Sequence, residues 1–251
     1  MKLYLTLLLL ISNCTTSFSA IGTEKINFKT TDNLTVTADL YKNENPKANV
    51  IILCHQAGFS RGEYIETAEK LVTLGYTCLA LDQRSGKEVN SVANETAKLA
   101  KELGLKQEYP NALPDIEAGL KYVKEHFANA KIMLIGSSYS SSLAIVIASK
   151  YPKDIKAIAS FSPGEYFKID NLTIEDFAKK VNCAVFITSA KNEGENWKAI
   201  YDVIPSKNKT SFLPQVKGFH GSKALWSSSD GNQEYWVAFK LFLESSFPKT
   251  K

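Results

Sequence analysis

The chain has 251 residues, of which 44% are hydrophobic and 22% are charged, and its formal net charge is +4. This length suits one large domain or two small ones, and the hydrophobic fraction is typical of a soluble globular protein. The basic residues are spread along the sequence without a run interleaved with aromatic residues, which argues against nucleic acid as a partner.

The first 20 residues have the layout of an export signal. Met1-Lys2 is positively charged, Leu3 to Ile11 is apolar, and Ser12 to Ala20 is small and polar. The apolar part is too short to cross a membrane. Cleavage after Ser19 would leave small residues at the positions that signal peptidase reads. We therefore expect a signal peptide over residues 1–19 and an exported mature protein, periplasmic or secreted.

A lipoprotein signal is the alternative. Ile11-Ser-Asn-Cys14 resembles a bacterial lipobox, in which Cys14 becomes the lipidated first residue, although Asn13 is unusual directly before that cysteine. Lipidation at Cys14 would anchor the protein to a membrane. No later segment is long and apolar enough to span one.

Three further cysteines, Cys54, Cys78 and Cys183, each lie in an apolar, strand-like run. An odd number in buried positions argues against a disulfide framework and favours small core side chains. Their spacing is not that of metal ligands, and we expect no metal site.

Strand and helix signals alternate along the rest of the chain. We expect strands at residues 25–29, 34–41, 49–54, 78–81, 132–135, 155–161, 184–187 and 212–216, and helices at residues 64–74, 92–103, 115–127, 143–148, 173–181, 197–204 and 234–247. The turn signal Asp32-Asn33 joins the first two strands into a hairpin. Pro214 places the last strand at a sheet edge.

This alternation, without a linker or an internal repeat, predicts one α/β domain over residues 20–251. Its central sheet is mostly parallel, with helices on both faces. In such sheets the chemistry collects at the carboxyl ends of the strands. The short stretch 162–182 leaves little room for a large lid, so we expect an open pocket.

The segment Gly136-Ser-Ser-Tyr-Ser140 lies between an expected strand and an expected helix. Small residues two positions before and after Ser138 are typical of a nucleophile elbow, a tight turn that lifts a serine hydroxyl above the sheet. The helix N-terminus there offers N–H groups to a developing anion. Ser140 stands where glycine is usual. The alternative is a serine-rich helix cap in an ordinary α/β protein.

A serine nucleophile needs a base, and histidine suits this role at neutral pH. The chain has three histidines. His126 ends an amphipathic helix beside charged residues, and His55 ends a strand before the elbow. His220 lies in a glycine-flanked loop after the last expected strand, which is where a base is expected. The alternative for His220 is an ordinary surface-loop histidine.

The third member of such a site is a carboxylate that orients the imidazole. Glu193 is the first carboxylate after the strand at residues 184–187, and Gly194 lets that loop turn. Glu195 is the competitor, because it also suits the first turn of the next helix. We prefer Glu193.

The order of serine, acid and histidine, each after its own strand, resembles that of the α/β-hydrolase superfamily over essentially all of the mature chain. The likeness is closest to the dienelactone hydrolase-like group, through His55-Gln-Ala-Gly58, Asp82-Gln-Arg84 and the His220-Gly221 ending. Gln56 stands where glycine is common in that group. Dienelactone hydrolases use a cysteine nucleophile, whereas this chain has Ser138.

The resemblance implies a role for each matching residue. Ser138 would be the nucleophile, His220 the base and then the acid, and Glu193 the orienting carboxylate. The oxyanion hole would combine the N–H of Tyr139 with a second N–H from Gln56 or Ala57. His55 would brace that loop. No cofactor is implied.

Side chains around this site are candidates for substrate contacts. Tyr139, Tyr166, Phe167 and Trp226 would line the pocket or belong to the core. Arg84, at the carboxyl end of a strand, would receive an acidic substrate group or pair with a nearby carboxylate.

The predicted function is an exported serine hydrolase that cleaves a small ester through an acyl-enzyme. One rival is a peptidase or an acyltransferase on the same triad. Another is a binding protein that keeps the fold without turnover, as the altered positions Gln56 and Ser140 would suggest.

Overall fold

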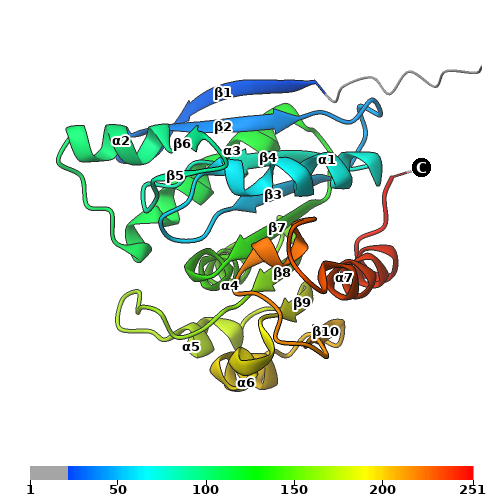
Figure 1. Cartoon of the computed structure of the whole chain (residues 1–251). Coiled ribbons are helices and arrows are strands. Elements are labelled where there is room, and N and C mark those ends of the chain that lie inside the picture. The colour runs from blue at the N-terminus through cyan, green and yellow to red at the C-terminus, as the bar shows by residue number, and fades with distance from the viewer. Residues whose placement is uncertain (1–21, 251) are drawn as a thin grey trace, which may run out of the picture.

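The computed structural model describes residues 22–250 and has a central eight-stranded sheet between helices (Figure 1). The expected signal peptide and Cys14 lie outside the described residues. The expected fold is confirmed in its main features. The sheet is mostly parallel, helices cover both of its faces, and the described residues begin with a β-hairpin.

The main sheet has the strand order β1-β2-β4-β3-β7-β8-β9-β10. Its strands are β1 (Thr23–Lys29), β2 (Thr35–Tyr41), β3 (Val50–Cys54), β4 (Thr77–Leu81), β7 (Ile132–Ser137), β8 (Ile155–Phe161), β9 (Ala184–Thr188) and β10 (Lys209–Phe212). The pairs β1–β2 and β2–β4 are antiparallel, and the remaining pairs are parallel. A separate small hairpin joins β5 (Glu88–Val89) to β6 (Val92–Ala93).

Seven α-helices occur among the described residues: α1 (Ile65–Thr73), α2 (Glu95–Glu102), α3 (Leu113–His126), α4 (Tyr139–Lys150), α5 (Ile174–Ala178), α6 (Gly194–Val203) and α7 (Asn232–Ser246). Short 3-10 helices are η1 (Arg61–Tyr64), η2 (Tyr109–Ala112), η3 (Lys191–Glu193) and η4 (Ser222–Leu225).

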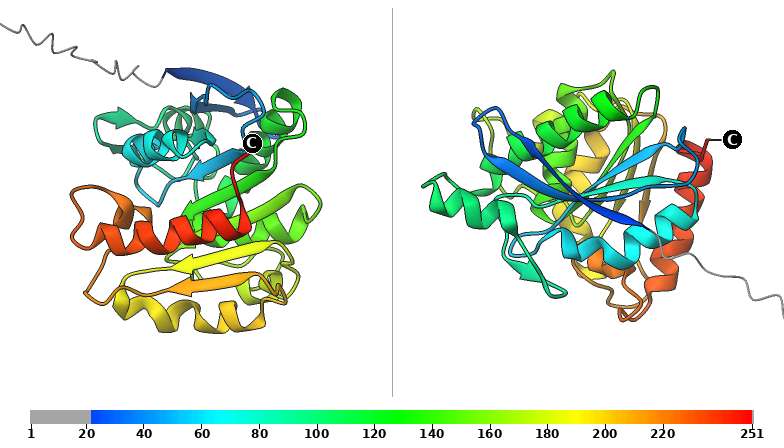
Figure 2. Two further views of the ribbon diagram at one scale, coloured as in Figure 1. Left: turned by 90° about the vertical axis from the view of Figure 1, so that its right-hand side faces the viewer. Right: turned by 90° about the horizontal axis from the view of Figure 1, so that it is seen from above.

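Two hydrophobic clusters hold the layers together. The first joins one face of the sheet to α3, α4, α5 and α6, and the second joins the other face to α1, η4 and α7. Figure 2 shows α7, the red helix, lying along the sheet. Strands β3, β4, β7 and β9 are buried along their whole length because helices cover both of their faces, which explains their continuous apolar sequences.

Several expected boundaries are wrong by three or more residues, among them those of the last strand and of the helix expected from residue 92. The last strand is β10, which pairs with β9 from Lys209 to Phe212, rather than residues 212–216. The chain leaves the sheet before Pro214, which has no N–H to give to a ladder. The helix expected from residue 92 begins at Glu95, because Asn94 caps it by accepting a hydrogen bond from the Ala97 N–H.

The connection between β8 and β9 holds one short helix, α5, capped by Thr173 and Asp176. As expected, no large lid is evident there. Residues 22–250 contain no helix with the length and apolar character that crossing a bilayer requires.

Candidate active site

A tight turn joins β7 to α4 and carries Ser138. Ser138 has φ +57° and ψ −124°, a backbone conformation that L-residues rarely adopt. A Cβ atom on Gly136 would lie 2.3 Å from the carbonyl oxygen of Ser140, so the turn closes only with glycine there. This strained strand-to-helix turn has the geometry of a nucleophile elbow.

Ser140, at the position where glycine is usual, has hydrogen-bond partners of its own. Its hydroxyl donates to the His55 carbonyl oxygen at 2.6 Å and accepts from the Gln83 side-chain amide at 2.6 Å. The serine therefore ties the elbow to the loops that follow β3 and β4. The turn is therefore tight with serine at this position, and the Ser140 side chain is one of the groups that hold it.

Three side chains from different elements form one hydrogen-bond chain. The His220 Nε2 atom lies 2.8 Å from the Ser138 hydroxyl, and the His220 Nδ1 atom lies 2.7 Å from Glu193 Oε1. A carboxylate only accepts, so the pattern assigns the ring proton to Nδ1 and leaves Nε2 free to accept from Ser138. The structure thus brings together the three residues that the sequence singled out.

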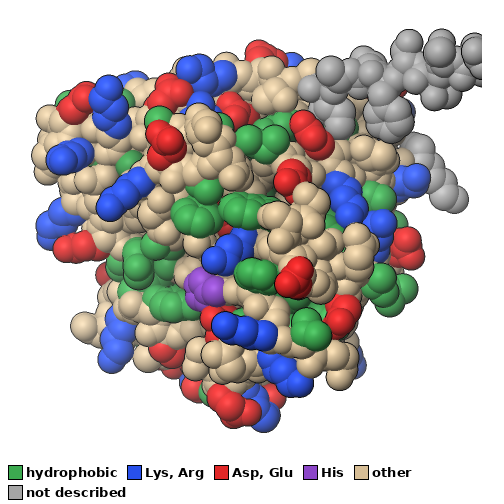
Figure 3. All heavy atoms as spheres, in the orientation of Figure 1, with side chains coloured by type: hydrophobic (Ala, Val, Ile, Leu, Met, Phe, Trp, Pro, Cys, Tyr) green, Lys and Arg blue, Asp and Glu red, His purple; other side chains and the backbone are tan. Residues whose placement is uncertain are grey.

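The site is reachable from solvent. Ser138 is 9% exposed, and the His220 side chain is 37% exposed. Figure 3 shows a histidine at the surface among hydrophobic side chains, with Lys or Arg side chains nearby. A small substrate can approach the serine without a large movement of the chain.

Glu193 uses both carboxylate oxygens. While Oε1 accepts from His220, Oε2 accepts from the Ser162 hydroxyl at 2.7 Å. Burial alone would raise the pKa of Glu193, but these hydrogen bonds outweigh it and hold the pKa below its usual value. Glu195 is exposed in the first turn of α6, where its charge suits the helix dipole.

Two backbone N–H groups are available for an oxyanion. Among the described residues, neither the Tyr139 N–H nor the Ala57 N–H has a protein acceptor. The prediction that Gln56 is a donor is wrong, because its N–H donates to the buried Glu63 carboxylate at 2.7 Å. Of the two residues that the sequence offered, Ala57 is therefore the one whose N–H is available.

His55 braces the loop that carries Ala57. Its Nδ1 atom bonds to the Gln56 carbonyl oxygen at 2.8 Å, and its Nε2 atom accepts from the Gln83 N–H at 2.9 Å. Complete burial lowers the pKa of His55 to about 4, so the ring is neutral near pH 7. A neutral ring fits the two hydrogen bonds, because it donates with one nitrogen and accepts with the other.

The assignment of Arg84 to an acidic substrate group is wrong. Its guanidinium is 3% exposed and pairs with Asp32 at 2.6 Å and Asp115 at 2.7 Å. These carboxylates occupy the face that a substrate would need. The structure instead agrees with the alternative, in which Arg84 pairs with nearby carboxylates.

Two partly exposed tyrosines lie around the elbow. The Tyr166 hydroxyl donates to the Ser162 carbonyl oxygen at 2.7 Å, and Tyr166 is 38% exposed. Tyr109, which the sequence did not single out, stacks on Tyr139 with ring centroids 4.6 Å apart and is 37% exposed. Tyr109 lies in the irregular stretch after residue 87, so no periodic pattern marked it.

The other aromatic candidates lie deeper in the protein or further along the chain. Tyr139 is fully buried, and Phe167 is a partly buried side chain packed against the core. Trp226 is partly buried, stacks on Phe59 and donates its indole N–H to the Glu63 carbonyl oxygen at 2.8 Å. Its contact with substrate stays a prediction.

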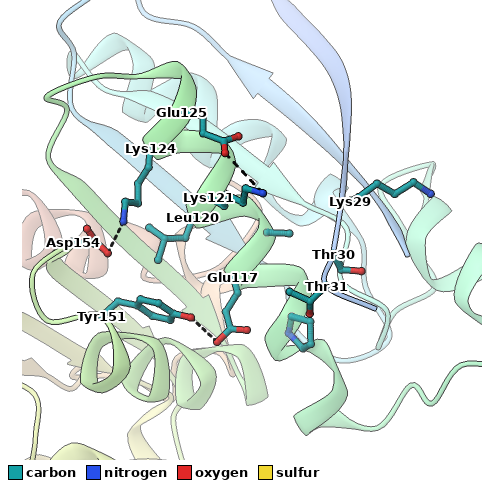
Figure 4. A pocket seen from close by; sticks show the side chains of 12 residues that line it. Lys29, Thr30, Thr31, Glu117, Leu120, Lys121, Lys124, Glu125, Tyr151 and Asp154 are labelled. Carbon is teal, nitrogen blue, oxygen red and sulfur yellow. Dashed lines mark hydrogen bonds and ion pairs between the residues drawn. The ribbon is translucent and has the colours of Figure 1, made fainter. Parts of the chain in front are cut away.

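Two cavities differ in their distance from the site. A cavity of about 620 Å³ borders it and is lined by residues that include His220, Glu193, Lys217 and Lys223. Another, of about 580 Å³, lies between α3, the β1–β2 turn and the end of α4 (Figure 4). Its wall residue Tyr151 is separated from Ser138 by the whole of α4, about 20 Å at 1.5 Å per residue.

Metal ligands do not gather in the described part of the chain. No group of three or more His, Cys, Asp or Glu side chains in residues 22–250 has a metal-binding arrangement. Cys54, Cys78 and Cys183 are free thiols, of which the first two are fully buried.

Comparison with solved structures finds many similar folds. The Pyrococcus furiosus esterase Pf2001 has a TM-score of 0.71 at 16% identity, covering 91% of this chain and 94% of that one. The dienelactone hydrolase from Anabaena variabilis has a TM-score of 0.71 at 10% identity, covering 90% and 99%. Est1E from Butyrivibrio proteoclasticus with bound ferulic acid has a TM-score of 0.67 at 16% identity, covering 88% and 98%. At these identities the likeness concerns the fold.

No curated protein matches the chain. The model of the dienelactone hydrolase family matches residues 36–197, which is well over half of the chain and includes the elbow and Glu193. Membership of this family supports hydrolysis of an ester bond. The chain belongs to the dienelactone hydrolase family.

Proposed function

We propose that this protein is an exported serine hydrolase that cleaves a carboxylic ester through Ser138, His220 and Glu193. The observation that carries the proposal is the unbroken hydrogen-bond chain of 2.8 Å and 2.7 Å that links the three side chains. A serine on a strained elbow, within hydrogen-bond reach of a solvent-accessible histidine, is the arrangement that nucleophilic acyl transfer requires.

In the first step, the Ser138 oxygen attacks the ester carbonyl carbon while its proton passes to His220 Nε2. The imidazolium that forms is stabilised by Glu193, which accepts the Nδ1–H. The negative charge that develops on the carbonyl oxygen is received by the N–H groups of Tyr139 and Ala57. Removing one such donor typically raises the barrier by about 2.7 to 4 kcal/mol.

The tetrahedral intermediate then collapses. His220 gives its proton to the leaving alkoxide, the alcohol departs, and the acyl group remains on Ser138. Water enters, loses a proton to His220 and attacks the acyl carbonyl carbon. The acid is released and the Ser138 hydroxyl is restored.

The proposed substrate is a small ester. The open site bordered by the half-exposed Tyr109 and Tyr166 favours compounds with an apolar or aromatic part. Est1E binds ferulic acid, an aromatic acid. Aromatic esters therefore belong in the substrate panel beside short aliphatic ones.

Export is proposed from residues 1–19, which lie outside the described residues. Cell fractionation of a host that expresses the full chain tests it. A processed protein in the periplasm or medium supports a cleaved signal, and a Cys14-dependent membrane fraction supports the lipoprotein alternative.

The enzymatic proposal is tested with p-nitrophenyl esters. The purified protein is expected to hydrolyse them, and Ser138→Ala is expected to remove the activity. Ser149→Ala, on the same helix, is the matched control and keeps the rate. Amine and alcohol acceptors separate a peptidase or an acyltransferase from an esterase. An inactive wild-type protein that binds ligands would instead support the binding-protein alternative.

A further inference from the structure

Glu63 is a buried acid that the mechanism above does not use. It lies in η1 and is 1% exposed. Its Oε2 atom accepts from the Gln56 N–H at 2.7 Å, and its Oε1 atom accepts from the Ser222 hydroxyl at 2.6 Å.

These two partners belong to two of the segments that carry the proposed site, and Ser137 belongs to the third. Gln56 directly precedes Ala57, Ser137 directly precedes Ser138, and Ser222 follows His220 by two residues. The segments are also linked to each other, since the Ser222 N–H donates to the Ser137 hydroxyl at 2.8 Å. The Glu63 carboxylate therefore joins the oxyanion loop to the histidine loop directly, and Ser222 connects it to the elbow.

The backbone of Glu63 is hydrogen-bonded to neighbouring residues as well. The Glu63 carbonyl oxygen accepts from the Trp226 indole at 2.8 Å, and the Glu63 N–H donates to the Ser60 carbonyl oxygen at 3.0 Å. Both the side chain and the main chain of Glu63 are thus fixed between the β3 loop and η4. The carboxylate has no freedom to leave its partners without breaking several bonds.

A buried carboxylate is unfavourable unless hydrogen bonds replace its lost hydration. Burial raises the pKa of Glu63, while the bonds from Ser222 and Gln56 and the charge of Lys223 lower it. An apolar side chain would fill the same space without the desolvation penalty. What the carboxylate adds is two oxygens that accept from two loops at once.

We propose that Glu63 is a positioning residue, whose carboxylate sets the distance between the Ala57 N–H, the Ser138 hydroxyl and the His220 ring. This rests on the proposed function, since it concerns the same site. Placement of catalytic groups matters most for the transition state. Loss of the carboxylate should therefore lower kcat more than it changes KM.

Two substitutions at this position separate its contributions. Glu63→Gln keeps one carbonyl oxygen as an acceptor and replaces the other with an amide donor, so one of the two loop contacts is weakened. Glu63→Met fills a similar volume and accepts from neither loop. With p-nitrophenyl acetate we expect kcat to fall about tenfold in the Gln variant and about a hundredfold in the Met variant, by comparison with loss of an oxyanion donor. KM stays within about threefold in both.

Glu66→Gln is the matched control. Glu66 is an exposed acid one turn further along, and its carboxylate accepts from the Ser227 N–H at 2.8 Å in the same C-terminal segment. It has no contact with Gln56, Ser137 or Ser222, so its kcat should equal that of the wild type. Ser222→Ala removes the other end of one Glu63 contact and should lower kcat as Glu63→Gln does.

The experiment measures kcat, KM and the melting temperature of each variant, after wild-type turnover and its loss in Ser138→Ala have been established. Wild-type inactivity would contradict the proposed function, whereas active wild type with unaffected Glu63 variants contradicts only the positioning role. A folded Glu63→Gln protein with kcat within twofold of the wild type overturns the proposal, even if its melting temperature falls. If the Met variant does not fold, the Gln and Ser222→Ala variants decide the outcome on the same criterion.

Discussion

Glu193 holds two side chains with one carboxylate, so replacing it changes more than a charge. In Glu193→Gln, the amide offers a donor where His220 Nδ1–H needs an acceptor, and the imidazole is driven toward the wrong tautomer. We expect kcat to fall by about 10²- to 10⁴-fold, by analogy with the same change in serine proteases. Glu195→Gln should leave the rate unchanged. A larger loss in Glu195→Gln would reassign the acid.

His55 predicts a pH-dependent loss of stability. The pKa of His55 is lowered from 6.5 to about 4 in the folded protein by burial, so the unfolded chain takes up a proton first as the pH falls. The effect of His55 on the free energy of unfolding is therefore constant well above pH 6.5. As the pH falls from 6.5 to 4, this effect lowers the free energy of unfolding. Between pH 7 and pH 5, it amounts to about 2 kcal/mol of the free energy of unfolding.

Urea denaturation at the two pH values, for wild type and His55→Gln, checks this prediction. The variant is less stable at pH 7 but should lose about 2 kcal/mol less on going to pH 5. Equal losses in both proteins would show that other groups cause the acid sensitivity.

At this scale the sequence pointed to the three side chains that the structure brings together and to the bracing role of His55, and it missed Glu63. Ser138, His220 and Glu193 followed from residue types placed after strands. Glu63 gave no such signal, because its partners are contributed by tertiary contacts with segments up to 159 residues away. The occupied N–H of Gln56 was missed because its acceptor, Glu63, comes close only through the path of the loop after β3.

At the scale of elements, the elbow between β7 and α4 depends on two small residues in different ways. Gly136 is required by space, as a Cβ atom would meet the Ser140 backbone. Ser140 is held by two buried hydrogen bonds, to His55 and Gln83. Restoring the usual glycine at position 140 would therefore remove contacts rather than relieve strain.

We expect Ser140→Gly and Ser140→Ala to lower the free energy of unfolding by about 1 to 3 kcal/mol, because the Gln83 amide is left buried without this acceptor. Chemical denaturation of both variants measures this. A Ser140→Gly protein more stable than the wild type would mean that the turn is strained by the side chain after all.

The elements themselves were predictable where the pattern was periodic. The buried parallel strands and the amphipathic α3 follow from local sequence. The order of the strands places the site at their carboxyl ends. The last strand was predicted at the wrong residues because the exposed, polar residues of β10 carry no hydrophobic signal. Only the pairing with β9 defines this strand. The β5–β6 hairpin is too short to leave a pattern at all.

At the scale of the whole molecule, the two arginines of the chain fasten the N-terminal hairpin and the strand loops to the body. Arg61 pairs with Asp39, Asp82 and Glu95, and Arg84 pairs with Asp32 and Asp115. These contacts join β2, the β1–β2 turn, α2 and α3 around the end of β4. The exposed cations of the protein are lysines, so the guanidinium groups serve the interior.

Arg84→Met should destabilise the protein by about 3 to 5 kcal/mol, because Asp115, at 0% exposure, is left without its partner. KM should be the same as in the wild type for both neutral esters and esters that carry a carboxylate. Urea denaturation and steady-state kinetics measure the two effects. Unchanged stability together with a raised KM for the acidic ester would restore Arg84 to the substrate site.

The central claim, that Ser138 is a nucleophile activated by His220, is tested most directly by treating the folded protein with a fluorophosphonate and mapping the adduct by mass spectrometry. We predict a single phosphonylated site at Ser138 in the wild type, formed much more slowly in His220→Ala. No adduct on Ser138 in the folded wild-type protein, or an equal rate of labelling without the histidine, would contradict the account.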